Sequence, residues 1–408
     1  MSGTFRSLRI YNYRLWASGA IVSNIGTWMQ RTAQDWLVLA ELTHHKASAV
    51  GIVMGLQFGP ALVLLPITGY AADHYDRRKI LLATQTLLGL LALGLGLLTV
   101  TGIVRLWQVD IFALLLGCVA AFDAPARQTF VSELVDETHL SNAVALNSTS
   151  FNAGRTIGPA IAGLLIAGIG TGWVFLVNAL SYIAVIGAML LLRKDDLNVR
   201  ERAVRTRGSL GEGFRYVWRR RDLRTVLLML AIVGMFGLNF PIFLSTMAVS
   251  AFHLGADGYG LLTSAMAIGS VSGALLSARR ERPRFRFLIG GAAVFGAGCL
   301  LAALTPNYWA FGVVMLVVGV ATQTFTTSTN AMVQLGTDPM MRGRVMAILL
   351  AIAMGTTPIG APIVGWIADH AGPRWALAVG GAAGIAAMLV GLRYLLARKT
   401  DASAAAAD

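Results

Sequence analysis

Twelve apolar runs, most of them as long as a membrane-crossing helix, dominate this sequence of 408 residues. A helix needs about 20 residues to cross the hydrocarbon core of a bilayer. Polar or Gly/Pro-rich breaks separate runs at 15–39, 48–71, 80–101, 107–122, 143–169, 173–192, 225–250, 259–278, 287–304, 308–325, 345–368 and 375–397. Barrel strands are shorter and alternate in polarity. The pattern therefore predicts an all-α membrane protein with twelve transmembrane helices.

Composition excludes several other classes of protein. Hydrophobic residues make up 56% of the chain and charged residues 13%, about half of the roughly 25% found in soluble domains. A disordered protein and a soluble enzyme are both excluded by these values. The net charge of +13 would suggest nucleic acid in a soluble chain, so the positions of the charges decide its meaning.

The basic residues follow the topology of a membrane protein. If the N-terminus is inside, 28 of the 33 Lys and Arg residues fall in the tails and inner breaks, and three, Lys46, Arg105 and Arg374, fall outside. Arg31 and Arg155 lie within runs. Because basic residues are retained on the cytoplasmic side, both termini are expected to be cytoplasmic, and no nucleic-acid partner is implied.

The longest polar break divides the runs six and six. It predicts an N-terminal six-helix bundle at 1–192, a cytoplasmic linker at 193–224, and a C-terminal six-helix bundle with a cytoplasmic tail at 225–408. An offset of 202 residues pairs Gly117 with Gly319, Asp136 with Asp338, Gly170 with Gly372 and Trp173 with Trp375. Two pseudo-symmetric halves of the same topology are typical of one large transporter architecture, whose substrate site lies between the halves. Residues 213–221 of the linker mix aromatics with arginines, as in a solvated linker or a helix at the lipid headgroups.

One inner break carries a recognisable motif, Gly69-x-x-x-Asp73 followed by Asp76-Arg77-Arg78-Lys79. Glycine permits close helix approach, and Asp73 could face the positive N-terminus of another helix. We interpret the motif as a gating latch, with an acidic cap beside positive-inside residues as the alternative. The loop resembles the signature of the major facilitator superfamily, although Asp76 stands where that pattern usually has glycine.

The fifth run carries a second motif, Gly154-Arg155-Thr-Ile-Gly158-Pro159-Ala-Ile-Ala-Gly163. Its small residues let a neighbouring helix come close, and Pro159 frees a carbonyl and bends the helix. The motif resembles the superfamily's motif associated with exporters that exchange substrate for protons. We group Gly158 and Pro159 with the gating residues.

Further stretches narrow the resemblance. They are Ser23–Gln30 with Ala33–Leu37, Asp123–Phe130, Asn239–Pro241, Gly258–Leu262 and Arg342–Val345. Together they are similar to the enterobactin-exporter-like, drug:proton antiporter branch of the superfamily. The resemblance implies a monomer in a bacterial inner membrane that exports a small amphipathic compound, such as a drug-like molecule or siderophore, in exchange for protons and without a cofactor.

The first run places polar residues on one helical face. Asn24, Trp28, Arg31 and Asp35 are spaced by 4, 3 and 4 residues, with Gln34 beside them. Ionisable groups in hydrocarbon are costly and mark functional sites by default. Asp35 is therefore the candidate proton carrier, with Arg31 one turn away as its partner. The alternative is a static Arg31–Asp35 ion pair that only tethers the helix.

Asn24, Trp28 and Gln34 of this face are candidates for a substrate cavity, together with polar residues of other runs. Arg155 needs a partner on another helix or a substrate. Asn239 and Gln323 could face the cavity or hold helices together by hydrogen bonds. We interpret Asp123 with Arg127 as a structural cap or loop pair rather than the proton site.

Some chemistries lack a motif. The six histidines form no metal-binding pattern, and no phosphate-binding loop indicates ATP. Within transport, an importer or symporter remains open. A transporter-like sensor or assembly subunit is a third class of function.

Overall fold

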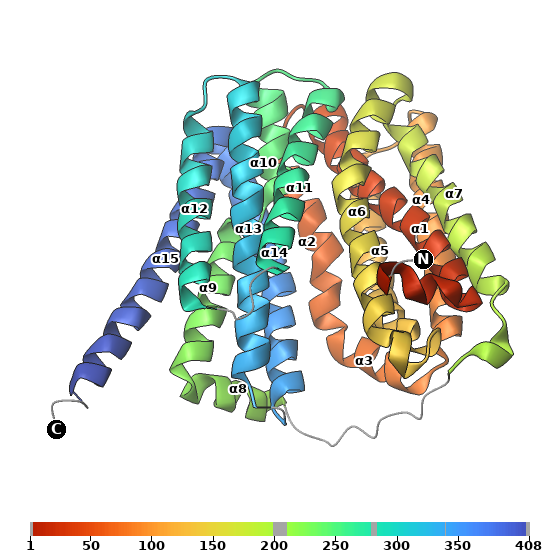
Figure 1. Ribbon diagram of the computed structural model, residues 1–408. Coiled ribbons are helices and arrows are strands. Elements are labelled where there is room, and N and C mark those ends of the chain that lie inside the picture. The colour runs from red at the N-terminus through yellow and green to blue at the C-terminus, as the bar shows by residue number, and fades with distance from the viewer. Residues whose placement is uncertain (1–2, 199–209, 279–283, 339, 405–408) are drawn as a thin grey trace. The chain divides into compact units, whose positions relative to one another are not determined.

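The computed structural model describes residues 3–198, 210–278, 284–338 and 340–404, although the side chains of a few of these residues, Asp73 among them, are not described (Figure 1). The described residues form helices and loops, without a strand. The all-α prediction is confirmed.

Nine helices in the described ranges have the length and apolar composition to cross a membrane. They are α4 (Arg77–Val100), α5 (Leu106–Phe130), α7 (Thr171–Leu190), α9 (Arg221–Phe236) continued by α10 (Phe240–Thr246), α11 (Ala256–Ala278), α12 (Phe285–Leu304), α13 (Tyr308–Gly336), α14 (Arg342–Ala371) and α15 (Pro373–Ala404).

The other three predicted spans also form helices. α1 (Tyr11–Trp36) and α6 (Glu137–Ile169) are long enough but carry many polar residues. The span at 48–71 is divided into α2 (Ala47–Val63) and α3 (Leu65–His74). Pro66 explains the division, because a proline disfavours continuation of the helix that precedes it. The helices are consistent with the predicted count of twelve.

Two helices extend beyond the ends that the apolar runs predict. The run at 107–122 stops where polar residues begin, but α5 continues to Phe130. The run at 308–325 likewise continues to Gly336 in α13. Hydropathy marks the apolar part of a helix, whereas the backbone continues wherever polar side chains find partners.

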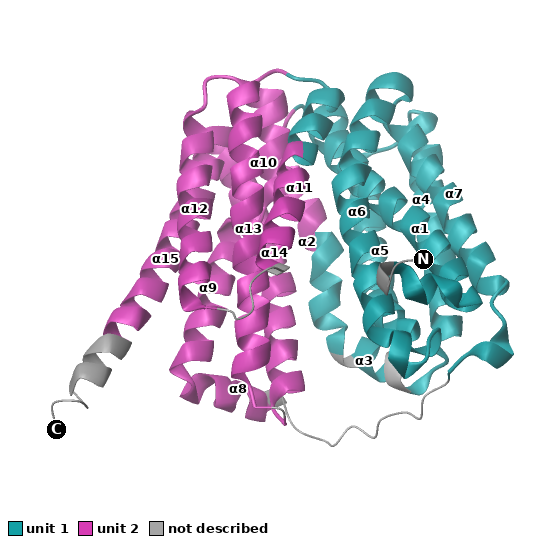
Figure 2. Ribbon diagram, viewed as in Figure 1, with its two compact units in different colours: residues 1–44, 56–204, 254–264 teal, residues 45–55, 205–253, 265–408 magenta. Residues whose placement is uncertain are grey.

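The described chain separates into two compact units by its contacts (Figure 2). Unit 1 comprises residues 1–44, 56–204 and 254–264, and unit 2 comprises 45–55, 205–253 and 265–408. The first turns of α2 thus group with unit 2, and the first turns of α11 with unit 1. The division at the central linker stays a prediction, and these two helices contribute to both units.

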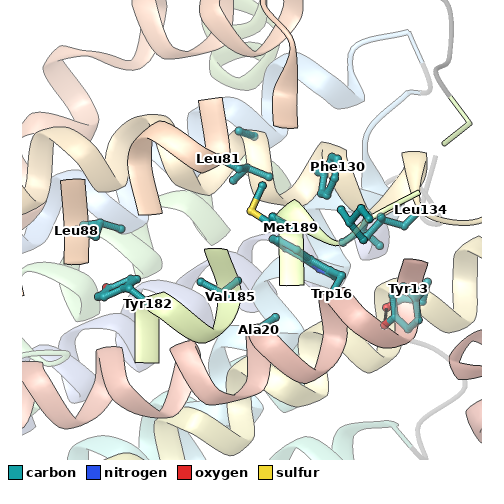
Figure 3. Close-up of a cluster of buried hydrophobic side chains, with 14 of the residues drawn as sticks. Tyr13, Trp16, Ala20, Leu81, Leu88, Phe130, Leu134, Tyr182, Val185 and Met189 are labelled. Atoms are coloured by element: carbon teal, nitrogen blue, oxygen red, sulfur yellow. Dashed lines mark hydrogen bonds between the residues drawn. The ribbon is translucent and has the colours of Figure 1, made fainter. Parts of the chain in front are cut away.

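In unit 1, α1 packs against α6 and α7, while α4 packs against α5 and α7. Figure 3 shows a buried cluster where these helices meet, with Trp16 edge-on to Phe130 at a centroid distance of 5.3 Å. The Tyr13 hydroxyl donates to the carbonyl of Ala143 at 2.8 Å. Since lipid tails are as apolar as leucine, such packing and hydrogen bonding hold helices together in a membrane.

In unit 2, α12 packs against α13 and α15, and α9 packs against α14 and α15. The short helix α8 (Leu210–Arg219) precedes α9 and joins α14 through an ion pair between Glu212 and Arg344 at 2.8 Å. Unit 2 is thereby anchored to the end of the linker that the structure describes.

The proposed repeat has local structural support. Gly170 has φ 91° and ψ 162° between α6 and α7, and Gly372 has φ 97° and ψ 162° between α14 and α15. These glycines are 202 residues apart, and both adopt a backbone conformation that favours glycine. The same sharp joint therefore occurs at corresponding places in the two halves of the sequence.

Candidate transport site

The predicted polar face of the first span lies on α1 in unit 1. Asn24, Gln34 and Asp35 are buried, with exposed fractions of 8%, 1% and 7%, and Trp28 and Arg31 are partly buried. One helix therefore brings together all five residues predicted for it.

The first part of this face packs against α6. The side-chain amide of Asn24 donates to the Ser150 hydroxyl at 3.1 Å. A methyl group added at Gly158 would lie 2.7 Å from Cβ of Trp28, so this glycine is needed for the close approach of the two helices. Pro159 is its buried neighbour within the continuous helix α6. The exporter-like motif of α6 therefore packs against α1 at Trp28.

Arg31 lies between two aromatic rings. Its guanidinium carbon is 4.9 Å from the ring centroid of Trp28 and 5.3 Å from that of Phe58. Its Nε is buried without a hydrogen-bond partner among the described residues. Among those residues, no ion pair within 4 Å joins Arg31 to Asp35. The static pair considered from the sequence is thus not formed.

Asp35 has a neighbour that the sequence did not assign. The hydroxyl of Tyr259, from the first turns of α11, interacts with the Asp35 carboxylate. The Tyr259 ring stacks on Trp36 with centroids 6.2 Å apart, and its side chain is 2% exposed. The Gly258-Tyr-Gly motif marked this tyrosine as part of a family pattern, but nothing local links it to a residue 224 positions earlier.

The remaining cavity candidates lie on other helices. Arg155 is partly buried on α6. In unit 2, Asn239 lies at the break between α9 and α10 and donates to the carbonyl of Met235 at 2.8 Å. Gln323 on α13 donates to the Thr327 hydroxyl at 3.2 Å. Each of these two hydrogen bonds joins residues of the same span.

The acidic and basic residues at 76–79 make specific bonds in unit 1. Asp76 accepts hydrogen bonds from the backbone N–H groups of Arg78 at 2.9 Å and Lys79 at 3.2 Å, and so caps α4. Arg77 pairs with Glu133 at 2.5 Å, and Arg78 donates to the carbonyl of Met189 at 2.9 Å. The departure from the family pattern at Asp76 is therefore a helix cap.

Two further residues of the gating motif lie on α3. Gly69 lies in α3, and Asp73 lies in its last turn. The side chain of Asp73 lies outside the described part of the structure. The gating role of both residues stays a prediction.

Asp123 has a full set of partners. One carboxylate oxygen accepts from Thr84 at 2.7 Å and Gln85 at 2.6 Å, and the other pairs with Arg127 at 3.1 Å. The cluster ties α4 to α5 through a buried network, which fits the structural interpretation. It is located within α5 rather than in a loop.

The N-terminus of α6 is closed by an acidic cap. Asp136 caps this helix, and its hydrogen bonds to Thr138 and His139 hold its pKa at about 2. The Asp136 carboxylate is therefore already hydrogen-bonded to groups in the first turn of α6. Elsewhere, no group of three or more His, Cys, Asp or Glu side chains suited to a metal ion occurs in the described ranges.

The arrangement of membrane helices, the basic motif at 76–79 and the buried ionisable face defines a membrane transporter of the major facilitator type. The chain belongs to the family described as "Transmembrane secretion effector", whose profile matches residues 2–408. It is thus a multi-pass membrane protein of a transporter family.

Several curated relatives match most of the chain. It is 28% identical to the "Multidrug efflux pump Tap" of Mycolicibacterium fortuitum over 86% of this chain and 88% of that one. It is 25% identical to the "Staphyloferrin A transporter" of Staphylococcus aureus, with the same two coverages. It is 27% identical to the "Enterobactin exporter EntS" of Shigella flexneri over 88% and 85% of the two chains.

Solved structures agree on the fold. The nucleoside transporter NupG superposes with a TM-score of 0.74 at 12% identity, covering 94% of this chain and 99% of that one. A bacterial homologue of the lysosomal transporter Spinster gives 0.69 at 15% identity, covering 94% and 95%. At these identities the likeness concerns the fold alone.

Proposed function

We propose that the protein exports a small amphipathic compound in exchange for protons, by alternating access. Its setting would be a bacterial inner membrane, with both termini cytoplasmic, and it would act as a monomer. Three relatives carry names of efflux pumps, exporters or transporters of small molecules. The proposal extends that class of activity to this chain.

The observation that carries proton coupling is the surroundings of Asp35. The carboxyl is buried on a membrane helix, is not neutralised by an ion pair with a described residue, and interacts with Tyr259. A lone carboxylate at such depth is costly, so it is a suitable group to bind a proton. Protonation would turn Asp35 from an acceptor for the tyrosine hydroxyl into a group that can also donate.

Tyr259 provides the link to conformational change. It lies in the first turns of α11, which group with unit 1, whereas α11 from residue 265 onward groups with unit 2. A change in the Asp35–Tyr259 interaction therefore acts on a helix that both units share. This is the physical route by which protonation would alter the balance between two states.

The test is transport by the purified protein in proteoliposomes. Lumenal pH is followed with a trapped pH-sensitive dye while a panel of fluorescent amphipathic dyes is offered on the other side. Export by antiport predicts proton movement opposite to the dye. Movement of both in the same direction would instead make the protein a symporter, and dye flux that ignores an imposed pH gradient would contradict proton coupling.

A further inference from the structure

Arg31 has unused hydrogen-bonding capacity inside the protein. A guanidinium has five N–H donors, and buried polar groups are nearly always hydrogen-bonded. The Nε of Arg31 is buried and has no hydrogen-bond partner among the described residues. Trp28 and Phe58 contact the guanidinium through their rings, which supply no hydrogen-bond acceptor of the usual oxygen or nitrogen type for this N–H group.

Gln34 has a second unused donor on the same helix face. It lies three residues after Arg31, a spacing that makes helix side chains neighbours. Its side chain is 1% exposed, and its Nε2 has no hydrogen-bond partner among the described residues. An unsatisfied buried donor costs about 1–3 kcal/mol. Two such groups side by side indicate a missing acceptor.

We propose that Arg31 and Gln34 bind a carboxylate of the exported compound, while Trp28 and Phe58 pack against a flat apolar part of the same molecule. The proposal rests on the proposed function, since its ligand is the transported compound. The planar fork of arginine matches a carboxylate with two parallel hydrogen bonds. Asp35 lies within electrostatic range of Arg31 but accepts no hydrogen bond from it and forms no ion pair with it within 4 Å, so the guanidinium can still donate to an anionic ligand.

The test compares two probes of one shape. The full-length protein in lipid nanodiscs is titrated calorimetrically with 2-naphthoate and with its neutral analogue 2-naphthamide. Naphthoate is expected to bind about tenfold or more tightly, because hydrogen bonds to charged groups contribute about 1.5–3 kcal/mol. In Arg31→Gln the ratio of the two affinities should fall to about one, with naphthamide binding unchanged.

Two further variants separate the contributions. Phe58→Leu should weaken both probes alike, and Arg105→Gln, which removes an exposed arginine at the start of α5, should alter neither. Equal affinities in the unmodified protein, no binding of naphthoate, or a ratio preserved in a folded Arg31→Gln would each overturn the proposal. If the preference is present but a pH gradient drives no transport, the proposed function fails and the binding site stands.

A different contact carries a second inference. Within unit 2, the Asp369 carboxylate at the end of α14 accepts from the backbone N–H groups of Ala47 at 2.6 Å and Ser48 at 3.0 Å, in the first turn of α2. A methyl group at Gly365 would lie 2.6 Å from the Ala47 carbonyl oxygen. Gly365-x-x-x-Asp369 repeats the spacing of Gly69-x-x-x-Asp73.

The position of this contact in the chain suggests its use. A helix N-terminus has free N–H groups and positive potential, which a carboxylate satisfies. Residues 47–55 of α2 group with α14, whereas α2 from Leu56 onward groups with unit 1. We infer that Asp369 is a releasable latch on α2, which opens when the first turns of this helix leave α14.

Cysteine labelling tests the latch. Ala47→Cys, at a position 1% exposed, is introduced after Cys118→Ser and Cys299→Ala, and maleimide labelling is timed in nanodiscs. Asp369→Ala should raise the labelling rate roughly tenfold, since it removes two bonds to a charged acceptor. Gly365→Ala should raise it as well, by steric pressure, whereas Asp257→Asn should not. Unchanged rates in folded Asp369→Ala and Gly365→Ala proteins would overturn the inference.

Discussion

Unit 1 contains two acid–arginine pairs at the same helical spacing, and only one of them forms an ion pair. Asp123 and Arg127 on α5 are bonded at 3.1 Å. Arg31 and Asp35 on α1 have the opposite order and form no ion pair within 4 Å, although each lies within electrostatic range of the other. An acid placed four residues before a base is the better arrangement in a helix, because side chains lean toward the N-terminus.

The satisfaction of the two pairs differs as well. Both oxygens of Asp123 are bonded, with Thr84 and Gln85 completing the set. On α1, the Nε of Arg31 and the Nε2 of Gln34 have no hydrogen-bond partner among the described residues, and on the other side Nη1 of Arg127 has none either. The difference therefore lies in the acids: Asp123 is bonded at both oxygens and stabilises the bundle, whereas Asp35, which forms no ion pair, is the acid proposed to bind a proton. Four predictions test this division.

The largest expected effect concerns Asp35→Asn. The substitution keeps the size of the side chain and removes the titrating group, so transport driven by a pH gradient should fall to the level of protein-free liposomes. Flux of dye down its own concentration gradient should persist, and the melting temperature should change little. Gradient-driven transport at the normal rate would contradict the assignment of Asp35.

Asp123→Ala should act on stability instead. It leaves the guanidinium of Arg127 buried without its acid, at a cost of about 3–5 kcal/mol. Thermal unfolding in detergent, followed by the fluorescence of a thiol-reactive dye, should show a clearly lowered midpoint. Asp35→Ala is the matched control and should lower it much less; the reverse ranking would invert the comparison.

Tyr259→Phe should have a smaller effect on transport. It removes only the hydroxyl next to Asp35, and a typical intramolecular hydrogen bond contributes about 0.5–1.5 kcal/mol. We expect the gradient-driven rate to fall roughly two- to tenfold, with the ring stack on Trp36 retained. Ser272→Ala, which removes an exposed hydroxyl farther along the same helix, serves as a control, and an equal loss in both variants would remove Tyr259 from the coupling.

The smallest stability effect is expected from exchanging the order of the α1 pair. The double variant Arg31→Asp/Asp35→Arg gives α1 the order of α5, and the new pair should stabilise the helix by about 0.3–0.5 kcal/mol. The melting temperature should stay the same or rise slightly while gradient-driven transport is lost. A double variant that melts far below the unmodified protein would show that order alone does not decide the pairing.

The sequence predicted the parts of this picture that depend on local spacing. The polar face of α1 follows from intervals of 3 and 4 residues, and the all-α membrane fold follows from long apolar runs. Tyr259 could not be assigned to Asp35, because the contact joins distant segments through packing. The division at Leu64 and the cap at Asp76 depend on single residues, Pro66 and Asp76, whose effects a hydropathy scan averages out.

The sharing of α2 and α11 between units has a consequence for biosynthesis. Unit 1 includes residues 254–264. The central linker is therefore translated before the last segment of unit 1 is synthesised. A chain cut at that linker would give an N-terminal fragment without Tyr259 and a C-terminal fragment without the partner of Asp369. Neither fragment alone contains a complete unit, and co-expression should be required to recover an assembled protein.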